Sequence, residues 1–456
     1  MSTLSDSDKN KWLTQGLAFL LLSGILFVVY LFFFLGPLQD FSYQPAYQIQ
    51  LNTDKIVFGC LIIMITAFFL PRDQRPSSWF LVFIYAFVII PRLVIWGCRD
   101  LNNLYPLCCL IVFIALLGVH TRIRQNEIKI PEKNQKIFLR FGRLLMTGFF
   151  LIAILVCVLM VLFEGLPTFQ AFDFSLTYEI RGDLNLPVFL SALLSFVGTF
   201  MLPMMLCVYV SRGDKTKILV VVLLELLLFM WTANKSWLYI IVLILVLAFI
   251  RHKELFSIVK LYFAITLAFA VLLLFQLFCA NETTDWLFTQ FIRRLIFVPS
   301  VLGYEYFIFF LDNPWILFNG TLLAPLTPMP SAYEIIDYQN HIAFQAFGSL
   351  DSWANTGLFG GEFANFGPYS FGLIFINLFL VIVLLNRYPA GNKDFTWLSA
   401  LFFTFTLLNV SSIRLIESPT GLLIMAAYIL IVVSSAALTS EANVEISEVK
   451  TQQYKD

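Results

Sequence analysis

The sequence predicts an all-α, polytopic integral membrane protein, and its composition supports this in three ways. Hydrophobic residues make up 59% of the 456 residues, while charged residues make up only 13%, against about 25% in a typical soluble domain. Fifty phenylalanines exceed what a soluble core can hide, and the mean hydropathy is +0.84. The 29 basic and 29 acidic residues balance, so no basic field attracts nucleic acid. A soluble enzyme, a disordered chain and a nucleic-acid binder are therefore excluded.

Twelve apolar stretches are long enough to propose as membrane-spanning helices. Such a helix needs about 20 apolar residues, because a chain in lipid must satisfy its backbone hydrogen bonds internally. The expected helices lie at 13–36, 55–70, 78–96, 104–119, 145–163, 186–210, 218–233, 236–250, 256–279, 369–386, 396–410 and 419–438. The first is too long for a signal peptide and no small-residue cleavage site follows a short apolar core, so we expect it to remain as an anchor.

The distribution of basic residues orients the chain. With the N-terminus in the cytoplasm, most of the 29 Lys and Arg residues fall into inside segments, as the positive-inside rule requires. Both termini are then cytoplasmic. The tail over 440–456 is rich in Glu, Ser and Lys, which predicts a disordered cytoplasmic end.

We expect one transmembrane domain over 1–456, with a single large outside loop at 280–368. This loop runs for about 90 positions, and loops of that length in compact proteins are usually functional or disordered. Its many Trp, Phe, Tyr and Leu residues argue against disorder. The stretch Trp286 to Phe310 predicts a helix on or in the outer interface, because aromatic rings favour the headgroup level. The large loop is therefore predicted to carry interfacial helices.

A small set of basic residues predicted on the extracytoplasmic side of the membrane (the outside cations) is the first candidate for a substrate-binding site. An arginine fork matches phosphate oxygens and stays charged when partly dry, so cations from separate loops around one mouth would suit a lipid-linked diphosphate. The alternative is that each cation neutralises a nearby acid, as Arg99 could neutralise Asp100, or extends to lipid headgroups. The candidates are Arg181, Lys235, Arg293, Arg294 and Arg414.

The sequence gives little support for a metal site or cofactor. The three histidines are far apart, the seven cysteines form no CxxC pair, and no outside segment contains a DxD motif. Glu225 lies in the middle of an apolar helix. It is either a buried hydrogen-bonded group or part of a relay. We expect no metal and no cofactor.

The end of the large loop is the sharpest local signal. Asn355, Glu362 and Asn365 lie among closely spaced glycines that permit tight turns and close backbone approach. Asn and Glu suit the recognition of sugar hydroxyls, and Glu could act as a base toward one. The alternative is a re-entrant turn with no chemistry. The glycines are Gly357, Gly360, Gly361, Gly367 and Gly372.

Four short motifs together resemble the bacterial O-antigen polymerases (Wzy class, the oligosaccharide repeat-unit polymerase family). They are TYEIR at 177–181, ANKS at 233–236, IRRLIFVP at 292–299 and NTGLFGGEFANFG at 355–367. The resemblance implies a multi-pass enzyme of the bacterial inner (plasma) membrane, of the lipid-dependent glycosyltransferase type, with its active site on the periplasmic face. Such an enzyme transfers a growing glycan from undecaprenyl diphosphate to a repeat unit on a second undecaprenyl diphosphate.

This resemblance and the residues suggest roles for the candidates. The outside cations would hold the diphosphate as it leaves, since fixed charges stabilise negative charge as it develops. Glu362 would activate the acceptor hydroxyl, with His341 and Asp351 as alternatives, and Asn355 and Asn365 would bind sugar. The related O-antigen ligases use a histidine near the end of their last loop, but His341 lies in no comparable motif. The implied partners are undecaprenyl-diphosphate-linked oligosaccharides, membrane lipid and a chain-length regulator protein, with no nucleic acid.

Three other functions stay open at this stage. A flippase for the same lipid-linked units has a similar number of helices, but it would need charges lining a cavity open to both sides and short outside loops. An O-antigen ligase shares the reaction class. A structural membrane protein would need none of these residues. The concentration of polar residues on one side of the membrane favours the enzyme.

Overall fold

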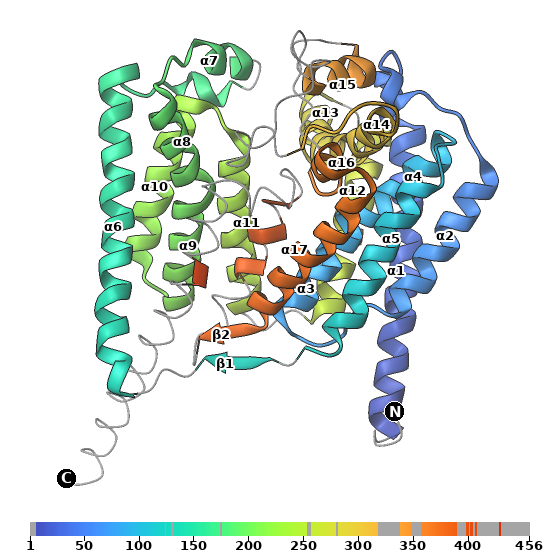
Figure 1. Cartoon of the computed structure of the whole chain (residues 1–456), viewed down its shortest axis with the longest axis horizontal. Coiled ribbons are helices and arrows are strands. Elements are labelled where there is room, and N and C mark those ends of the chain that lie inside the picture. Colours follow the sequence, from blue (N-terminus) through green and yellow to red (C-terminus); the bar gives the residue numbers. More distant parts are fainter. Residues whose placement is uncertain are drawn as a thin grey trace. The chain divides into compact units, whose positions relative to one another are not determined.

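The computed structural model describes residues 6–123, 125–128, 132–173, 176–252, 257–279, 281–317, 338–348, 357–389, 398–400, 402–404, 406–407 and 428–429. Their regular secondary structure is helical apart from two short strands (Figure 1). The chain divides into two compact units. Unit 1 comprises 1–124, 256–383 and 403–422, and unit 2 comprises 125–255, 384–402 and 423–456. Because the chain leaves unit 1 and later returns to it, unit 1 is built from distant parts of the sequence.

Seven helices in the described residues are long and apolar enough to cross a membrane, as expected of an α-helical membrane protein. Each runs through a mostly hydrophobic sequence, and helical hydrogen bonding satisfies most of its backbone internally. The last of them along the chain is interrupted at Gly367, where φ is 51°. The seven candidate spans are Asn10–Phe41, Pro76–Cys98, Arg140–Glu164, Phe189–Arg212, Ile258–Phe278, Thr284–Asp312 and Gly360–Leu385. The predicted class of membrane-embedded helical protein is confirmed.

Unit 1 combines the helices of the first 124 residues with those of a later part of the chain. Its first part comprises α1 (Asp6–Leu35), η1 (Pro37–Phe41), η2 (Pro45–Tyr47), α2 (Thr53–Phe68), α3 (Pro76–Ile84), the π turn η3 (Tyr85–Ile89), α4 (Ile90–Cys98) and α5 (Leu104–His120). Its later part comprises α12 (Ile258–Phe278), α13 (Glu282–Leu287), the π segment η7 (Phe288–Phe297), α14 (Val298–Asp312), α15 (Tyr338–Phe347), α16 (Gly360–Phe366) and most of α17 (Ser370–Leu385).

Helix α1 is the central packing element of unit 1. It contacts α2, α4 and α12, and a buried hydrogen bond of 2.8 Å joins the Ser23 and Tyr262 hydroxyls of α1 and α12. Near the start of α1, the Arg72 guanidinium lies 3.5 Å from the centre of the Trp12 ring and donates to the Trp12 carbonyl at 2.6 Å. Contacts made by residues far apart in sequence therefore hold the first helix of the chain in place.

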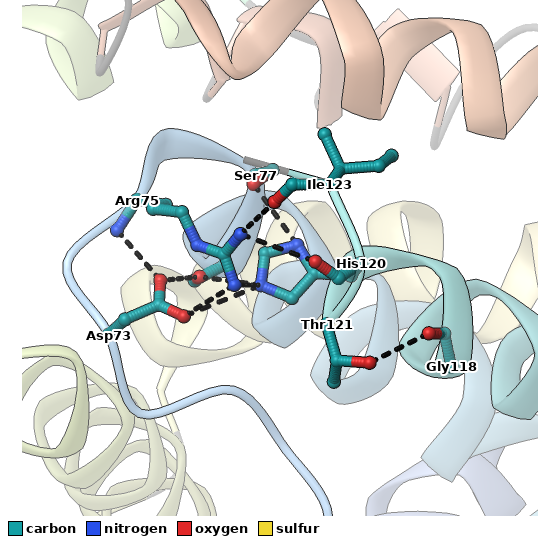
Figure 2. Close-up of polar contacts among 8 residues, drawn as sticks. Asp73, Arg75, Ser77, Gly118, His120, Thr121 and Ile123 are labelled. Carbon is teal, nitrogen blue, oxygen red and sulfur yellow. Dashed lines mark hydrogen bonds and ion pairs between the residues drawn. The ribbon is translucent and has the colours of Figure 1, made fainter. Parts of the chain in front are cut away.

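The connection between α2 and α3 is held by a polar network (Figure 2). The Arg75 guanidinium donates to the Asp73 carboxylate at 2.7 Å and lies 2.8 Å from His120 Nε2. Ser77 Oγ lies 3.2 Å from His120 Nδ1, and Ser78 Oγ donates to Asp73. Burial alone would raise the pKa of Asp73, but hydrogen bonds from His120, Arg75 and Ser78 lower it well below its ordinary value. The network joins the end of α5 to the start of α3.

Unit 2 is a helical cluster around α10. Its helices are α6 (Glu132–Glu164), η4 (Phe169–Phe172), α7 (Thr177–Asp183), α8 (Val188–Phe196), the π turn η6 (Val197–Met201), α9 (Leu202–Arg212), α10 (Lys215–Thr232) and α11 (Lys235–His252). Helix α10 contacts α6, α7, α9, α11 and η4. Strands β1 (Asn126–Ile128) and β2 (Arg387–Pro389) form a parallel pair.

Most of the predicted helices coincide in position with described helices, while the number of twelve spans stays a prediction, since seven described helices meet the length and hydropathy expected of a span. Two placements differ from the prediction. Helix α6 begins at Glu132 rather than near 145, because a charged stretch continues the helix below the hydropathy threshold. The expected interfacial helix at 286–310 belongs to an unbroken helical segment, Glu282–Asp312, that is long and apolar enough to span a membrane. Expected helices 396–410 and 419–438 are described only in part, and the tail 440–456 lies outside the described residues.

Candidate functional site

Helix α14 is the structural element that gathers five of the predicted site residues. It contacts η7, which carries Arg293 and Arg294, as well as α15 with His341 and α16 with Glu362 and Asn365. Helices α13 to α16 lie together at the end of unit 1 opposite the N-terminus (Figure 1). Residues far apart in sequence are thereby carried by neighbouring elements at one end of this unit.

Arg293 lies in a polar and aromatic setting formed by the loop after α1. Its guanidinium donates to Gln44 Oε1 at 3.1 Å and lies 4.1 Å from the centre of the Phe41 ring. The Tyr47 ring lies 5.6 Å from the same guanidinium. Burial raises the pKa of Tyr47 to about 12, although the positive charge of Arg293 opposes this. The phenol therefore stays neutral, and the π systems stabilise the cation.

The Arg293 guanidinium has no ion-pair partner among the residues that the structure describes. Its Nε is buried and donates to no acceptor within the same residues. Arg294 is half-buried beside it in η7, a ten-residue π segment. Segments of this kind are rare and recur at functional sites. Arg293 thus keeps donor capacity that the described protein does not use.

Arg99 shows the opposite arrangement. It was expected to neutralise its neighbour Asp100, and this expectation is wrong. Arg99 pairs with Glu305 of α14 at 2.7 Å, and both side chains are largely buried. Asp100 pairs instead with Lys55 at 2.7 Å, because the backbone turns at Asp100 with φ of 47°. Arg99 therefore has an anionic partner, whereas Arg293 has none among the described residues.

Glu362 and Asn365 lie on the short helix α16, packed against α14. The Phe307 and Phe363 ring centres are 4.6 Å apart across this contact. Glu362 is 0% exposed and Asn365 is 8% exposed. Asn365 Nδ2 donates to the Gly361 carbonyl at 3.0 Å, while its Oδ1 is buried and accepts no hydrogen bond within the described chain. That oxygen is an acceptor without a described donor.

Two of the glycines singled out in the sequence adopt a backbone conformation that favours glycine. Gly357 has φ of 58° and Gly367 has φ of 51°, both in the left-handed region that favours glycine. At Gly367 a Cβ atom would lie 2.3 Å from the Trp315 ring. The tight turns and close approach predicted for this segment are confirmed at these two positions.

His341 lies on α15 against an aromatic surface. Its ring centre is 5.4 Å from that of Phe309, and its Nε2 lies 3.2 Å from Gln345 Nε2. No described contact of His341 involves a charged group. Its chemistry as an alternative base stays a prediction.

Two further predicted cations belong to unit 2. Arg181 lies on α7, next to Ile180, which packs against a buried cluster of Ala171, Phe229 and Ala233. Lys235 begins α11 two residues after Ala233 and is 7% exposed. The elements carrying these two residues therefore meet at the end of α10. The side chain of Arg181, and all of Asp351, Asn355 and Arg414, lie outside the described residues.

Glu225 lies on α10 and is 1% exposed. Of the two alternatives for it, the hydrogen-bonded group finds no support, because neither carboxyl oxygen has a hydrogen-bond partner in the described chain. Within the same residues, no group of three or more His, Cys, Asp or Glu side chains could hold a metal ion.

Sequence reasoning did not single out Arg92. Arg92 is 2% exposed within the candidate span Pro76–Cys98. Its guanidinium donates to backbone carbonyls, including that of Leu358 just before α16, and also contacts the Tyr105 hydroxyl. A lone arginine inside an apolar run was the available signal, since ionisable residues at membrane depth are costly and usually functional.

Comparison with known proteins adds no relative from which a function could be transferred. No family model, curated protein or solved structure matches the chain. The α-helical membrane class is shown by the fold. Everything finer depends on the motifs and on the geometry around α14.

Proposed function

We propose that this protein is a metal-independent glycosyltransferase that polymerises undecaprenyl-diphosphate-linked oligosaccharide repeat units into O-antigen or a similar surface polysaccharide. In this proposal the chain has about twelve spans and both termini in the cytoplasm of a bacterial inner membrane. Its active site lies on the periplasmic side, at the large loop over 280–368. The lipid-dependent glycosyltransferase type follows from the four motifs described above.

The observation that carries the proposal is the half-buried guanidinium of Arg293, which has no ion-pair partner among the described residues. Its described partners are neutral, namely Gln44 and the Phe41 and Tyr47 rings. A cation in partly dry surroundings attracts an anion strongly, because the effective dielectric constant is low. A diphosphate supplies such an anion, and the planar fork of arginine matches its oxygens.

The proposed reaction joins two lipid-linked glycans. The acceptor hydroxyl attacks the anomeric carbon of the donor sugar, the bond from that carbon to the diphosphate oxygen breaks, and the hydroxyl proton passes to Glu362. Negative charge grows on the leaving diphosphate, and Arg293 stabilises it most strongly as it develops. Asn365 offers to a sugar hydroxyl its amide oxygen, which accepts no hydrogen bond from the described residues.

The burial of Glu362 sets a condition on this mechanism. Its side chain has no exposed surface in the structure, so an acceptor hydroxyl reaches the carboxylate only when substrate displaces side chains that cover it. Exclusion of bulk water from the base would also protect the donor from hydrolysis, which competes with transfer.

The test is complementation of a deletion strain, read as the length distribution of surface glycan. Arg293→Ala, at normal membrane abundance, should lose long chains and leave single repeat units, since one such electrostatic group contributes about 10²–10³ in rate. Arg293→Lys should restore chains only in part, because lysine lacks the fork. Arg140→Ala, at an exposed arginine of α6, should give a normal ladder.

The deletion strain itself separates the alternatives. A polymerase deletion leaves single-unit glycan on the surface, a flippase deletion leaves none outside, and a ligase deletion leaves chains unattached. A normal ladder from Arg293→Ala would remove that residue from the site. Absence of all surface glycan in the deletion strain would overturn the polymerase in favour of the flippase.

A further inference from the structure

Arg92 is the buried cation of unit 1 that the mechanism above does not use. It lies on α4, directly after Pro91 and the π turn η3 (Tyr85–Ile89). Its guanidinium donates to the Val88 carbonyl at 2.8 Å and to the Leu358 carbonyl at 2.7 Å. No ion pair joins it to a described side chain. The buried Arg92 guanidinium therefore uses these two hydrogen bonds to join the backbone of α4 to the backbone at Leu358.

The backbone that Arg92 holds is an unusual turn. Leu358 lies between two residues with left-handed backbone, Gly357 with φ of 58° and Phe359 with φ of 85°. A positive φ at a phenylalanine is strained and persists only when its surroundings impose it. The Phe359 ring lies 5.2 Å from the Arg92 guanidinium carbon. Arg92 thus contacts two successive residues of the turn, and α16 begins at the next one.

Arg92 is itself held from two other helices. Its Nε lies 3.4 Å from the Tyr105 hydroxyl of α5, and the Tyr304 hydroxyl of α14 donates to its backbone carbonyl at 3.2 Å. Gly303 on α14 provides the space, since a Cβ atom there would lie 2.2 Å from the Tyr105 hydroxyl and 3.5 Å from an Arg92 nitrogen. Contacts with α5 and α14 therefore fix the position of Arg92 independently of the turn at 357–359.

We infer that Arg92 is a positioning residue: its guanidinium fixes the turn at 357–359 and thereby sets α16, with Glu362 and Asn365, against α14. The fixing of the turn is independent of any activity. The role of Glu362 at the end of this chain of contacts rests on the proposed function. Because preorganised groups must be held closely to their working geometry, an error of about 1 Å in α16 would cost on the order of 100-fold in rate.

The positioning is tested without activity, by hydrogen exchange of the backbone amides of 357–366 in the full-length protein. Arg92→Lys keeps the charge but loses the fork that reaches both carbonyls. Gly303→Ala disturbs Arg92 and Tyr105 from the opposite side. Both variants should speed exchange in 357–366 at least tenfold and leave α17 unchanged. Gly118→Ala on α5, where a Cβ meets nothing within 4 Å, is the matched control.

Two results of the exchange experiment would overturn the inference. One is unchanged exchange of 357–366 in both variants. The other is faster exchange spread equally through α17, because that pattern indicates general loosening of the unit. If Arg92→Lys fails to insert, Gly303→Ala and Tyr105→Phe provide the same measurement.

The link to Glu362 is tested by kinetics with polyprenyl-diphosphate-linked repeat units. Arg92→Lys should lower kcat on the order of 100-fold with little change in KM. In a Glu362→Gln background the same substitution should cause no further loss, because the two residues act as one unit. Independent, multiplying losses would refute the link. A wild-type protein without polymerising activity would refute the proposed function, while the exchange result would still decide the role of Arg92.

Discussion

Replacement of Asp73 by asparagine is expected to destabilise the connection between α2 and α3 by about 1–2 kcal/mol. The carboxylate accepts hydrogen bonds from the Arg75 guanidinium at 2.7 Å and backbone N–H at 3.0 Å, and it lies 3.6 Å from His120 Nε2. Hydrogen bonds to charged groups contribute about 1.5–3 kcal/mol. The Asp73 side chain is 42% exposed, so solvent screens part of this. Asparagine keeps the shape and one acceptor.

The pH dependence of this effect has a definite sign. Hydrogen bonds lower the pKa of Asp73 in the folded protein. A carboxyl of this kind contributes stability that is complete above its unfolded-state pKa of about 3.9 and is lost as pH falls through the folded value. The difference in stability between wild type and Asp73→Asn should therefore be constant from about pH 8 to pH 5 and shrink below about pH 4.

The assay is thermal unfolding of purified protein in detergent at a fixed scan rate, from about pH 8 to about pH 3, which includes the range below the unfolded-state pKa of Asp73. Asp73→Asn should lower the apparent melting temperature by about 2–4 °C at neutral pH. The control is Asp214→Asn, since Asp214 makes an exposed ion pair with Lys217 and asparagine still caps α10. An equal shift in the control would refute the reasoning. A difference already lost between about pH 7 and pH 6 would show that His120 titration controls the network.

Two further outcomes are expected. Glu225→Leu should raise the melting temperature by an amount equivalent to about 1–3 kcal/mol, because it removes a buried carboxyl with no described hydrogen-bond partner. Glu225→Gln should raise the melting temperature less. A lower melting temperature with leucine would show that Glu225 has a partner outside the described residues. A membrane-impermeant maleimide should label the exposed Cys279 from the periplasmic side, and Cys279→Ser should abolish this labelling, whereas labelling only from the cytoplasmic side would reverse the proposed orientation.

The helices could be predicted from the sequence because a membrane imposes a simple rule of apolar length. Helix α5, expected at 104–119, occupies Leu104–His120. The rule fails where polar residues lie in a helix, so the early start of α6 at Glu132 and the helical segment Glu282–Asp312 were not fully foreseen. In both cases charges lower the hydropathy without interrupting backbone hydrogen bonding.

The site was predictable at the level of residue type and less so at the level of partners. Arg293 was identified as one of a few cations predicted outside the membrane, and Glu362 by its place among closely spaced glycines at the end of the large loop. The partner of Arg99 could not be found, because Glu305 lies 206 positions away while Asp100 is adjacent. Arg92 was not singled out because two of its acceptors, the Val88 and Leu358 carbonyls, are backbone groups that carry no signature in the sequence. Contacts between distant segments are fixed by the fold and not by local pattern.

The hydrogen bond from Arg92 to Leu358 has a consequence for biogenesis. The two residues are 266 positions apart, and ribosomes add about 5–20 residues per second. The arginine must therefore wait on the order of tens of seconds in the nascent chain before its acceptor is synthesised. During that interval the guanidinium of Arg92 lacks its Leu358 acceptor, and an ionisable group within an apolar helix is costly to place in lipid. Unit 1 therefore completes its folding only after the last third of the chain has been synthesised.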